Sequence, residues 1–150
     1  MTILSHDASS IHGDSGGQTP LKAYDNNFQT IFAPRDERNT ADWVEFRFER
    51  QRISKVQIYN RIGCCPGLLY NTDVKVEDTT DATSFLCGNI NPGTRTTVEE
   101  GGTPEMFEFN CWFNIGDKIK MYDRDVSARS TLSFSEIRIF TSKFKIGKQM

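Results

Sequence analysis

Apolar and polar residues alternate with a period of two along much of the chain from Trp43 onward. Val44, Phe46 and Phe48 are separated by charged residues, and the alternation recurs further along the chain. The later apolar positions are Val56 and Ile58, Val74 and Val76, Phe107 and Phe109, Ile119 and Met121, and Ile137 and Ile139. Successive side chains of a strand point to opposite faces, so the pattern predicts strands with one buried and one solvated face. Such strands are typical of antiparallel sheets.

Segments rich in Gly, Pro, Asn and Asp separate these stretches, as at residues 89–93 and 100–104. No segment shows the 3.6-residue periodicity of an amphipathic helix. We therefore expect an all-β fold, a sandwich or jelly roll of two antiparallel sheets, with the 11 phenylalanines supplying much of the core. A length of 150 residues predicts a single domain, 1–150, with its core at about 9–140 and a basic tail over 141–150 that carries Lys143, Lys145 and Lys148.

Composition excludes several classes of function. A net charge of -2 argues against a surface dedicated to nucleic acid. No apolar run approaches the ~20 residues that a membrane-spanning helix needs. The first residues do not resemble a signal peptide, which predicts either an intracellular chain or a mature extracellular one. His6 and His12 are the only histidines, and no nucleophile or paired carboxylate is placed for catalysis, so an enzyme is the least expected class.

The segment 60–74 contains two adjacent cysteines, Cys64 and Cys65, between two predicted strands. A bond between them would close a small ring and fix the local backbone beside a binding site, whereas two free thiols are the alternative. Four cysteines can pair in three ways, and a Cys64–Cys65 bond would leave Cys87 to pair with Cys111 in an oxidising compartment. A zinc site is disfavoured because the cysteines lack paired Cys-x-x-Cys spacing.

Several motifs in chain order resemble those of the F-type lectins, fucose-binding modules among the discoidin-like (coagulation factor type C) jelly rolls. The motifs are Trp43-Val-Glu-Phe, Asn60-Arg61-x-x-Cys64-Cys65, the single cysteines Cys87 and Cys111, and the segment Ser135-Glu136-Ile-Arg-Ile-Phe140. The resemblance covers about Ser9 to Phe140. It implies a discoidin-like sandwich, a vicinal disulfide and a Cys87–Cys111 bond.

In these lectins a histidine and two arginines hold fucose, and the vicinal disulfide packs on an apolar edge of the sugar. Arg61 matches the first arginine, but the second falls on Leu68 and the histidine near Pro34. Each lost charge-assisted partner weakens binding by roughly 1.5–3 kcal/mol, so ordinary fucose binding is not expected. The candidate ligand-binding residues are Arg61, Cys64, Cys65, Arg35, Arg38 and Tyr70. The alternative for Arg61 is an ion pair with Asp73 or Asp36.

A disulfide found in many of these lectins has no counterpart here. Its two positions hold approximately Phe32 and Ser135. The loss of both cysteines together predicts that an apolar contact replaces the bridge.

The family also has a structural cation site, and the resemblance implies Ca2+ held by hard oxygen ligands. The matching positions are Lys22, Asp25, Asn27, Ser135 and Glu136. The alternative is a turn rich in Asp and Asn, with Glu136 in a salt bridge.

Two functions follow from the resemblance. The first is a lectin-like module that binds a glycan through the loop of Arg61 and Cys64–Cys65. The second is a docking subunit of a larger protein assembly, for example a ciliary one, that binds no sugar. The first places the chain outside the cell and the second inside it.

Overall fold

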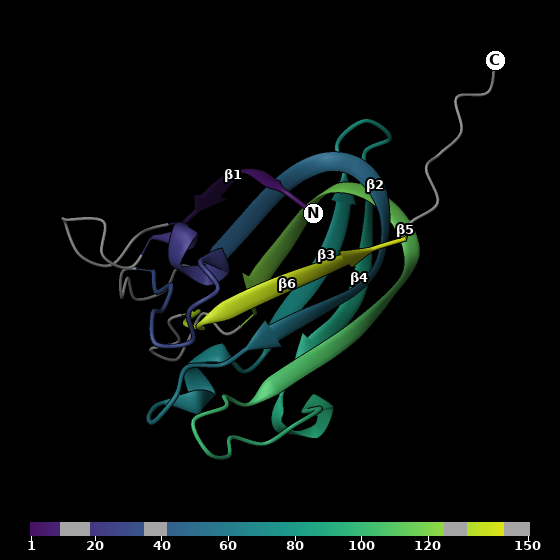
Figure 1. The fold of residues 1–150 in the computed structure, drawn as a ribbon. Helices are drawn as coiled ribbons and strands as arrows, with labels where there is room; N and C mark the ends of the chain where they lie inside the picture. The colour runs from purple at the N-terminus through teal and green to yellow at the C-terminus, as the bar shows by residue number, and fades with distance from the viewer. Residues whose placement is uncertain (10–18, 35–41, 125–131, 143–150) are drawn as a thin grey trace.

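A computed structural model describes residues 1–9, 19–34, 42–124 and 132–142 of the chain (Figure 1). The strands are β1 (Ile3–Ala8), β2 (Trp43–Tyr59), β3 (Thr72–Asp78), β4 (Thr83–Ile90), β5 (Met106–Asp123) and β6 (Glu136–Thr141). Within the described ranges, three short 3-10 helices lie between these strands: η1 (Pro20–Tyr24), η2 (Pro66–Leu69) and η3 (Pro92–Thr94). The described residues form no α-helix, which confirms the all-β prediction. No helix in these ranges is long and apolar enough to cross a membrane.

Two long strands, β2 and β5, bend and run through both layers of a sandwich (Figure 1). The first half of β2 pairs with β1 and with the second half of β5, which also pairs with β3; β4 completes that layer. The second half of β2 lies between β6 and the first half of β5, and these three form the other layer. Every pairing is antiparallel. The predicted fold class, a discoidin-like sandwich of two antiparallel layers, is confirmed.

The inward faces of the strands supply the core. All the apolar positions that alternate in the sequence are buried except Ile139, which is partly buried and packs against the core. Phe32 and Phe134 are fully buried, their rings meet edge to face at 5.7 Å, and their backbones form an isolated bridge. The sequence predicted an apolar contact near Phe32 and Ser135, and the structure has one at Phe32, with Phe134 rather than the neighbouring Ser135 supplying the ring.

Strand β1 has no clear signal in the sequence. Most of its residues are exposed, since it lies at the edge of its layer and, among the described strands, pairs only with β2. His6 lies within it and contacts the hydroxyl of Tyr24 at 2.6 Å through Nδ1. Arg35, Asp36, Arg38, His12 and the basic residues of the tail lie outside the described residues.

Candidate functional site

The loop between β2 and β3 crosses from one layer of the sandwich to the other. Gly63 and Cys65 have positive φ angles of 89° and 62°, a backbone that glycine adopts at low cost. Cys64 and Cys65 are bonded to each other, and both are exposed. Pro66 begins η2, which ends with the fully buried Leu69. The loop is therefore anchored by Leu69 and presents the vicinal disulfide to solvent.

Arg61 lies at the start of this loop and is half-buried. Its backbone N–H donates to Asn60 Oδ1 at 2.8 Å, and its Nη1 donates to Ser133 Oγ at 3.5 Å. Its Nε is buried and has no hydrogen-bond partner among the described residues. A buried donor without an acceptor is costly, so an oxygen placed against this atom would relieve that cost.

The ion pair between Arg61 and Asp73 that the sequence left open is not formed. Asp73 instead accepts a hydrogen bond from Asn89 Nδ2 at 2.9 Å, and its carboxylate lies 3.7 Å from Arg124 Nε. Asp36 lies outside the described residues, as do Arg35 and Arg38.

Tyr70 belongs to a polar network under the loop. Its hydroxyl lies 3.3 Å from both carboxylate oxygens of Glu105, and its ring meets Phe107 edge to face. Glu105 is 7% exposed, accepts from Asn60 Nδ2 at 2.9 Å and pairs with Arg95 Nε at 2.5 Å. Since the hydroxyl of Tyr70 is bonded within the protein, this residue positions the loop. The sequence did not indicate Glu105 or Arg95, because a single buried acid in a turn-rich segment carries no periodic signal.

The predicted cation ligands meet where the loop after η1 packs against the start of β6. Glu136 Oε2 accepts from the N–H of Asn26 at 3.2 Å, and Arg138 Nη2 donates to Asn26 Oδ1 at 3.2 Å. Burial raises the pKa of Glu136 to about 7, with a further contribution from the negative charge of Asp25. The Glu136 carboxylate close to the negative charge of Asp25, with the side-chain amide of Asn26 beside Arg138, provides hard oxygen donors of the kind that fit a divalent cation.

The oxygens of this loop also hydrogen-bond within it. Asp25 accepts from the N–H of Asn27 at 3.0 Å and from Thr30 Oγ1 at 2.6 Å, and Asn27 Oδ1 accepts from the N–H of Gln29 at 2.9 Å. These are the contacts of the Asp/Asn-rich turn weighed as the alternative, although a carboxylate keeps further lone pairs for a metal. Thr30 was not predicted here.

The other two predicted ligands lie next to these residues in the chain. Lys22 is in η1, and the side chain of Ser135 donates to the carbonyls of Tyr59 and Asn60 at 3.1 and 2.8 Å. No group of three or more His, Cys, Asp or Glu side chains within the described ranges is arranged to hold a metal ion.

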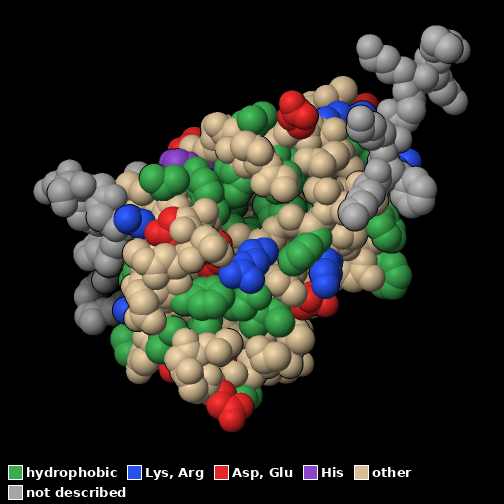
Figure 2. Space-filling model, viewed as in Figure 1, with side chains coloured by type: hydrophobic (Ala, Val, Ile, Leu, Met, Phe, Trp, Pro, Cys, Tyr) green, Lys and Arg blue, Asp and Glu red, His purple; other side chains and the backbone are tan. Residues whose placement is uncertain are grey.

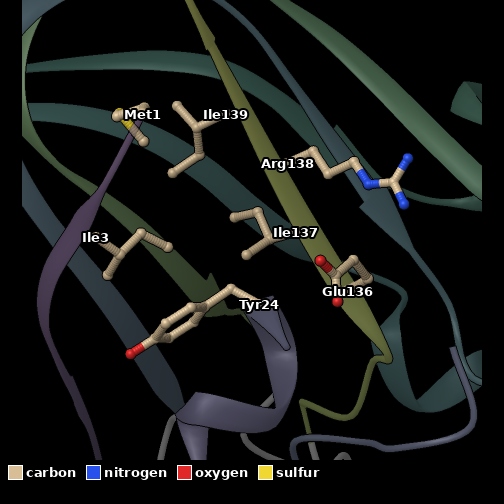
Figure 3. A pocket seen from close by; sticks show the side chains of 7 residues that line it. All are labelled: Met1, Ile3, Tyr24, Glu136, Ile137, Arg138 and Ile139. Carbon is tan, nitrogen blue, oxygen red and sulfur yellow. The ribbon is translucent and has the colours of Figure 1, made fainter. Parts of the chain in front are cut away.

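Glu136 also lines a hollow of ≈ 230 Å³ between β1 and β6 (Figure 3). The close-up shows Met1, Ile3, Ile137 and Ile139 gathered on one side, with the guanidinium of Arg138 pointing away from them. The hollow thus has a mixed lining, in which Tyr24, Glu136 and Arg138 join the aliphatic side chains. Because the guanidinium points away, its polar groups do not converge as they do in a sugar site.

Comparison with solved structures defines the fold. A fucose-binding module of Streptococcus pneumoniae superposes with a TM-score of 0.71 at 20% identity, over 95% of this chain and 96% of that one. A CBM32 module of Clostridium perfringens, in complex with GalNAc-β-1,3-galactose, gives 0.70 at 14% identity, over 91% and 94%. The chain has the discoidin-like fold. No protein-family model and no curated protein sequence matches it.

The serum fucolectin of striped bass (Morone saxatilis) has the same fold. It superposes with a TM-score of 0.70 at 15% identity, over 94% of this chain and 46% of that one. The discoidin-like chain thus corresponds to about half of that longer lectin. Identities this low establish the architecture, and the ligand has to be argued from the side chains.

Proposed function

We propose that this protein is a non-enzymatic module that binds a glycan through the loop of Arg61 and the Cys64–Cys65 disulfide. The observation that carries the proposal is the buried Nε of Arg61, which has no acceptor among the described residues. A sugar hydroxyl would accept from it, while the exposed disulfide offers a small apolar surface to a ring edge. Arg35 and Arg38 are the candidates for a second cationic contact.

The ligand is a glycan other than one held as fucose is held by the F-type lectins. The resemblance implies that Leu68 takes the place of their second arginine, and Leu68 is half-buried within η2. An aliphatic side chain cannot replace a bidentate donor. Similar modules bind different sugars, as the fucose-binding and GalNAc-β-1,3-galactose-bound structures illustrate, which supports a glycan without naming it.

The two disulfides support function in an oxidising compartment, which we propose to be extracellular. A structural Ca2+ ion, held by Asp25, Asn27 and Glu136 with carbonyls of Lys22 and Ser135, is the second part of the proposal. The cation would neutralise the two carboxylates and join the loop after η1 to β6. It would take no part in a reaction.

A glycan array probed with the wild-type chain and with Arg61→Ala tests the glycan site. Loss of one charge-assisted hydrogen bond predicts affinity about ten- to a hundredfold lower for Arg61→Ala. Arg61→Lys keeps the charge but not the planar fork and should lie between the two. Arg47→Ala is the matched control, since Arg47 is an exposed arginine of β2 that pairs with Glu45.

Counting free thiols completes the test. Specific glycan binding with no free thiol supports the lectin-like function. An array without binding, together with four free thiols, would support the docking subunit instead. Equal glycan profiles for the wild type and Arg61→Ala would move the site away from this loop.

A further inference from the structure

The outer face of the three-stranded layer carries a second group of polar and aromatic side chains, remote from the disulfide loop. The registers place Phe140, Lys55 and Asn110 in one row across β6, β2 and β5. Gln57 and Glu108 are partners in the next row. The neighbouring Val56, Ile58 and Phe107 are fully buried, so these polar side chains point outward. Figure 2 views this face and shows Lys and Arg side chains among hydrophobic ones over β6.

A hollow of ≈ 290 Å³ opens on this face. It is lined by Ser54, Lys55, Glu108, Asn110 and Phe113. This volume is at the small end of ligand-binding pockets and matches a ligand of one or two rings. It combines a cation, a carboxylate, an amide and a hydroxyl with an aromatic ring.

The charged groups of the hollow are connected and neutralise each other. Lys55 Nζ lies 3.2 Å from Glu108 Oε2, which also accepts from Gln57 Nε2 at 2.7 Å. These contacts hold the pKa of Glu108 below its ordinary value, so it remains an ionised acceptor at neutral pH. Lys55 Nζ also lies 4.9 Å from the centre of the Phe140 ring. The hollow thus has fixed donors and acceptors but no excess charge, which favours a neutral polar ligand over an anion.

Phe113 is held at the rim of the hollow by an unusual backbone. Trp112 and Phe113 have φ angles of 54° and 57°, and their exposed fractions are 70% and 52%. Asn110 Oδ1 accepts from the N–H of Trp112 at 2.7 Å, and Asn114 Nδ2 donates to the carbonyl of Cys111 at 2.9 Å. The Cys87–Cys111 disulfide anchors the same segment to β4. Phe113 therefore has a defined position although solvent surrounds much of it.

This arrangement is unfavourable for folding alone. Each residue of this type in the left-handed region raises the free energy by roughly 1–2 kcal/mol, and exposed aromatic surface adds no stability. Strain of this kind persists where the surroundings hold it and is concentrated at functional sites. The bulge formed by Trp112 and Phe113 in β5 presents both aromatic rings outward, and the ring of Phe113 borders the polar hollow.

We propose that this hollow is a second saccharide-binding site that takes one neutral pyranose residue. The C–H groups on one face of a pyranose carry partial positive charge and pack on the ring of Phe113, whose face is negative. Hydroxyls at the ring's edge accept from Lys55 and donate to Glu108, and Asn110 offers its amide. A flat apolar ligand would offer these polar groups no further hydrogen bond, and an anion would meet the Glu108 carboxylate.

NMR titration of the full chain tests the proposal. Backbone amide shifts are followed while galactose, N-acetylgalactosamine, glucose, mannose and fucose are added separately to millimolar concentrations. At least one sugar should shift the amides of Lys55, Glu108, Asn110 and Phe113 with saturation. Phe113→Ala should weaken this binding about tenfold, and Glu108→Gln should weaken it as well.

Two further variants separate the sites. Leu86→Ala is the control, since Leu86 is an exposed apolar residue of β4, 50% accessible, and should bind as the wild type does. Arg61→Ala should abolish shifts in the disulfide loop and leave those around Phe113 intact, so either site can fail without the other. The proposal is overturned if none of the sugars shifts these amides, if Phe113→Ala and Glu108→Gln both bind as the wild type does, or if the face proves to be covered by a protein partner.

Discussion

Glu105 stabilises the disulfide loop from its buried side, although its side chain does not contact the exposed part of the loop. Its carboxylate joins Asn60 and Tyr70, which lie at the two ends of the loop, to Arg95 from the segment after η3. Because the side chain of Glu105 is buried, these contacts are shielded from water. The orientation of Arg61, the residue after Asn60, depends on this network.

We predict that Glu105→Gln destabilises the protein by about 1–3 kcal/mol, since the guanidinium of Arg95 loses its partner and the remaining bonds lose their charge assistance. Urea unfolding followed by fluorescence measures this. Glu99→Gln removes an exposed acid of the same region and should change stability by less than about 0.5 kcal/mol. Equal midpoints for the two variants would show that the network has no structural role.

The two disulfides act on different elements and should contribute differently. Cys87 and Cys111 are 24 positions apart and join β4 to β5, so their bond restricts a long loop of the unfolded chain. Removing it as Cys87→Ala with Cys111→Ala should cost about 3 kcal/mol. Cys64 and Cys65 are adjacent and close no such loop.

Replacing Cys64 and Cys65 with serine should therefore leave the unfolding midpoint nearly unchanged while weakening glycan binding. Thermal unfolding midpoints of the Cys64/Cys65 serine variant and of the Cys87/Cys111 alanine variant, each compared with that of the wild type, test this difference. A large loss of stability from the adjacent pair would mean that the loop is part of the folding unit and not only a recognition surface.

Gly116 marks the place where β5 passes from one layer to the other. A Cβ there would lie 2.4 Å from Val76 Cγ1 and 2.8 Å from the carbonyl oxygen of Glu77, and that backbone cannot move without disturbing β3. Gly116→Ala should cost about 1–3 kcal/mol through overpacking. Gly67→Ala, whose nearest neighbour would be Tyr70 Cδ2 at 3.8 Å, is the control for the urea midpoint. A neutral Gly116→Ala would mean that the strand can bend without this close approach.

The alternation of apolar and polar residues predicted the strands because it depends only on neighbours within one strand. Val44, Val56 and Ile119 each mark the buried face of the strand that contains them. In edge strand β1 only Ile3 and Ala8 are partly buried, too few to give an alternating pattern. The two exposed aromatics, Trp112 and Phe113, interrupt the alternation of β5, and this was a signal of the bulge that sequence reasoning did not use. The contacts of Glu105 join positions far apart in the chain, and no pattern in one sequence indicates such pairs.

At the scale of the whole molecule, β2 connects the two proposed sugar sites. Lys55 lies in the strand and Arg61 follows its end, a separation of about 20 Å for extended chain. A single oligosaccharide of several residues can span such a distance, and two weak sites joined through one ligand bind more tightly than either alone. Oligosaccharides should therefore bind better than their component monosaccharides.

The stability of the whole domain should depend jointly on pH and Ca2+ through Glu136. Its pKa is raised to about 7, so without a cation the folded state retains a proton that the unfolded chain releases above about pH 4.5. Glu136 then makes its full contribution to the free energy of unfolding below about pH 4.5. This contribution, at most about 3 kcal/mol, is lost as pH rises through 7.

The proposed Ca2+ ion would bind the ionised carboxylate, so it should stabilise the protein strongly at about pH 8 and weakly at about pH 5. The effect of Ca2+ is measured at each pH as the difference between the thermal unfolding midpoint in Ca2+ and that in a chelator. The contributions of other titrating groups are the same in both samples and cancel in this difference. Glu136→Gln keeps an acceptor for the N–H of Asn26 but removes the charge, and it should reduce the Ca2+ effect at both pH values. If Ca2+ shifts the midpoint equally at both pH values, or shifts neither, these oxygens form only the Asp/Asn-rich turn.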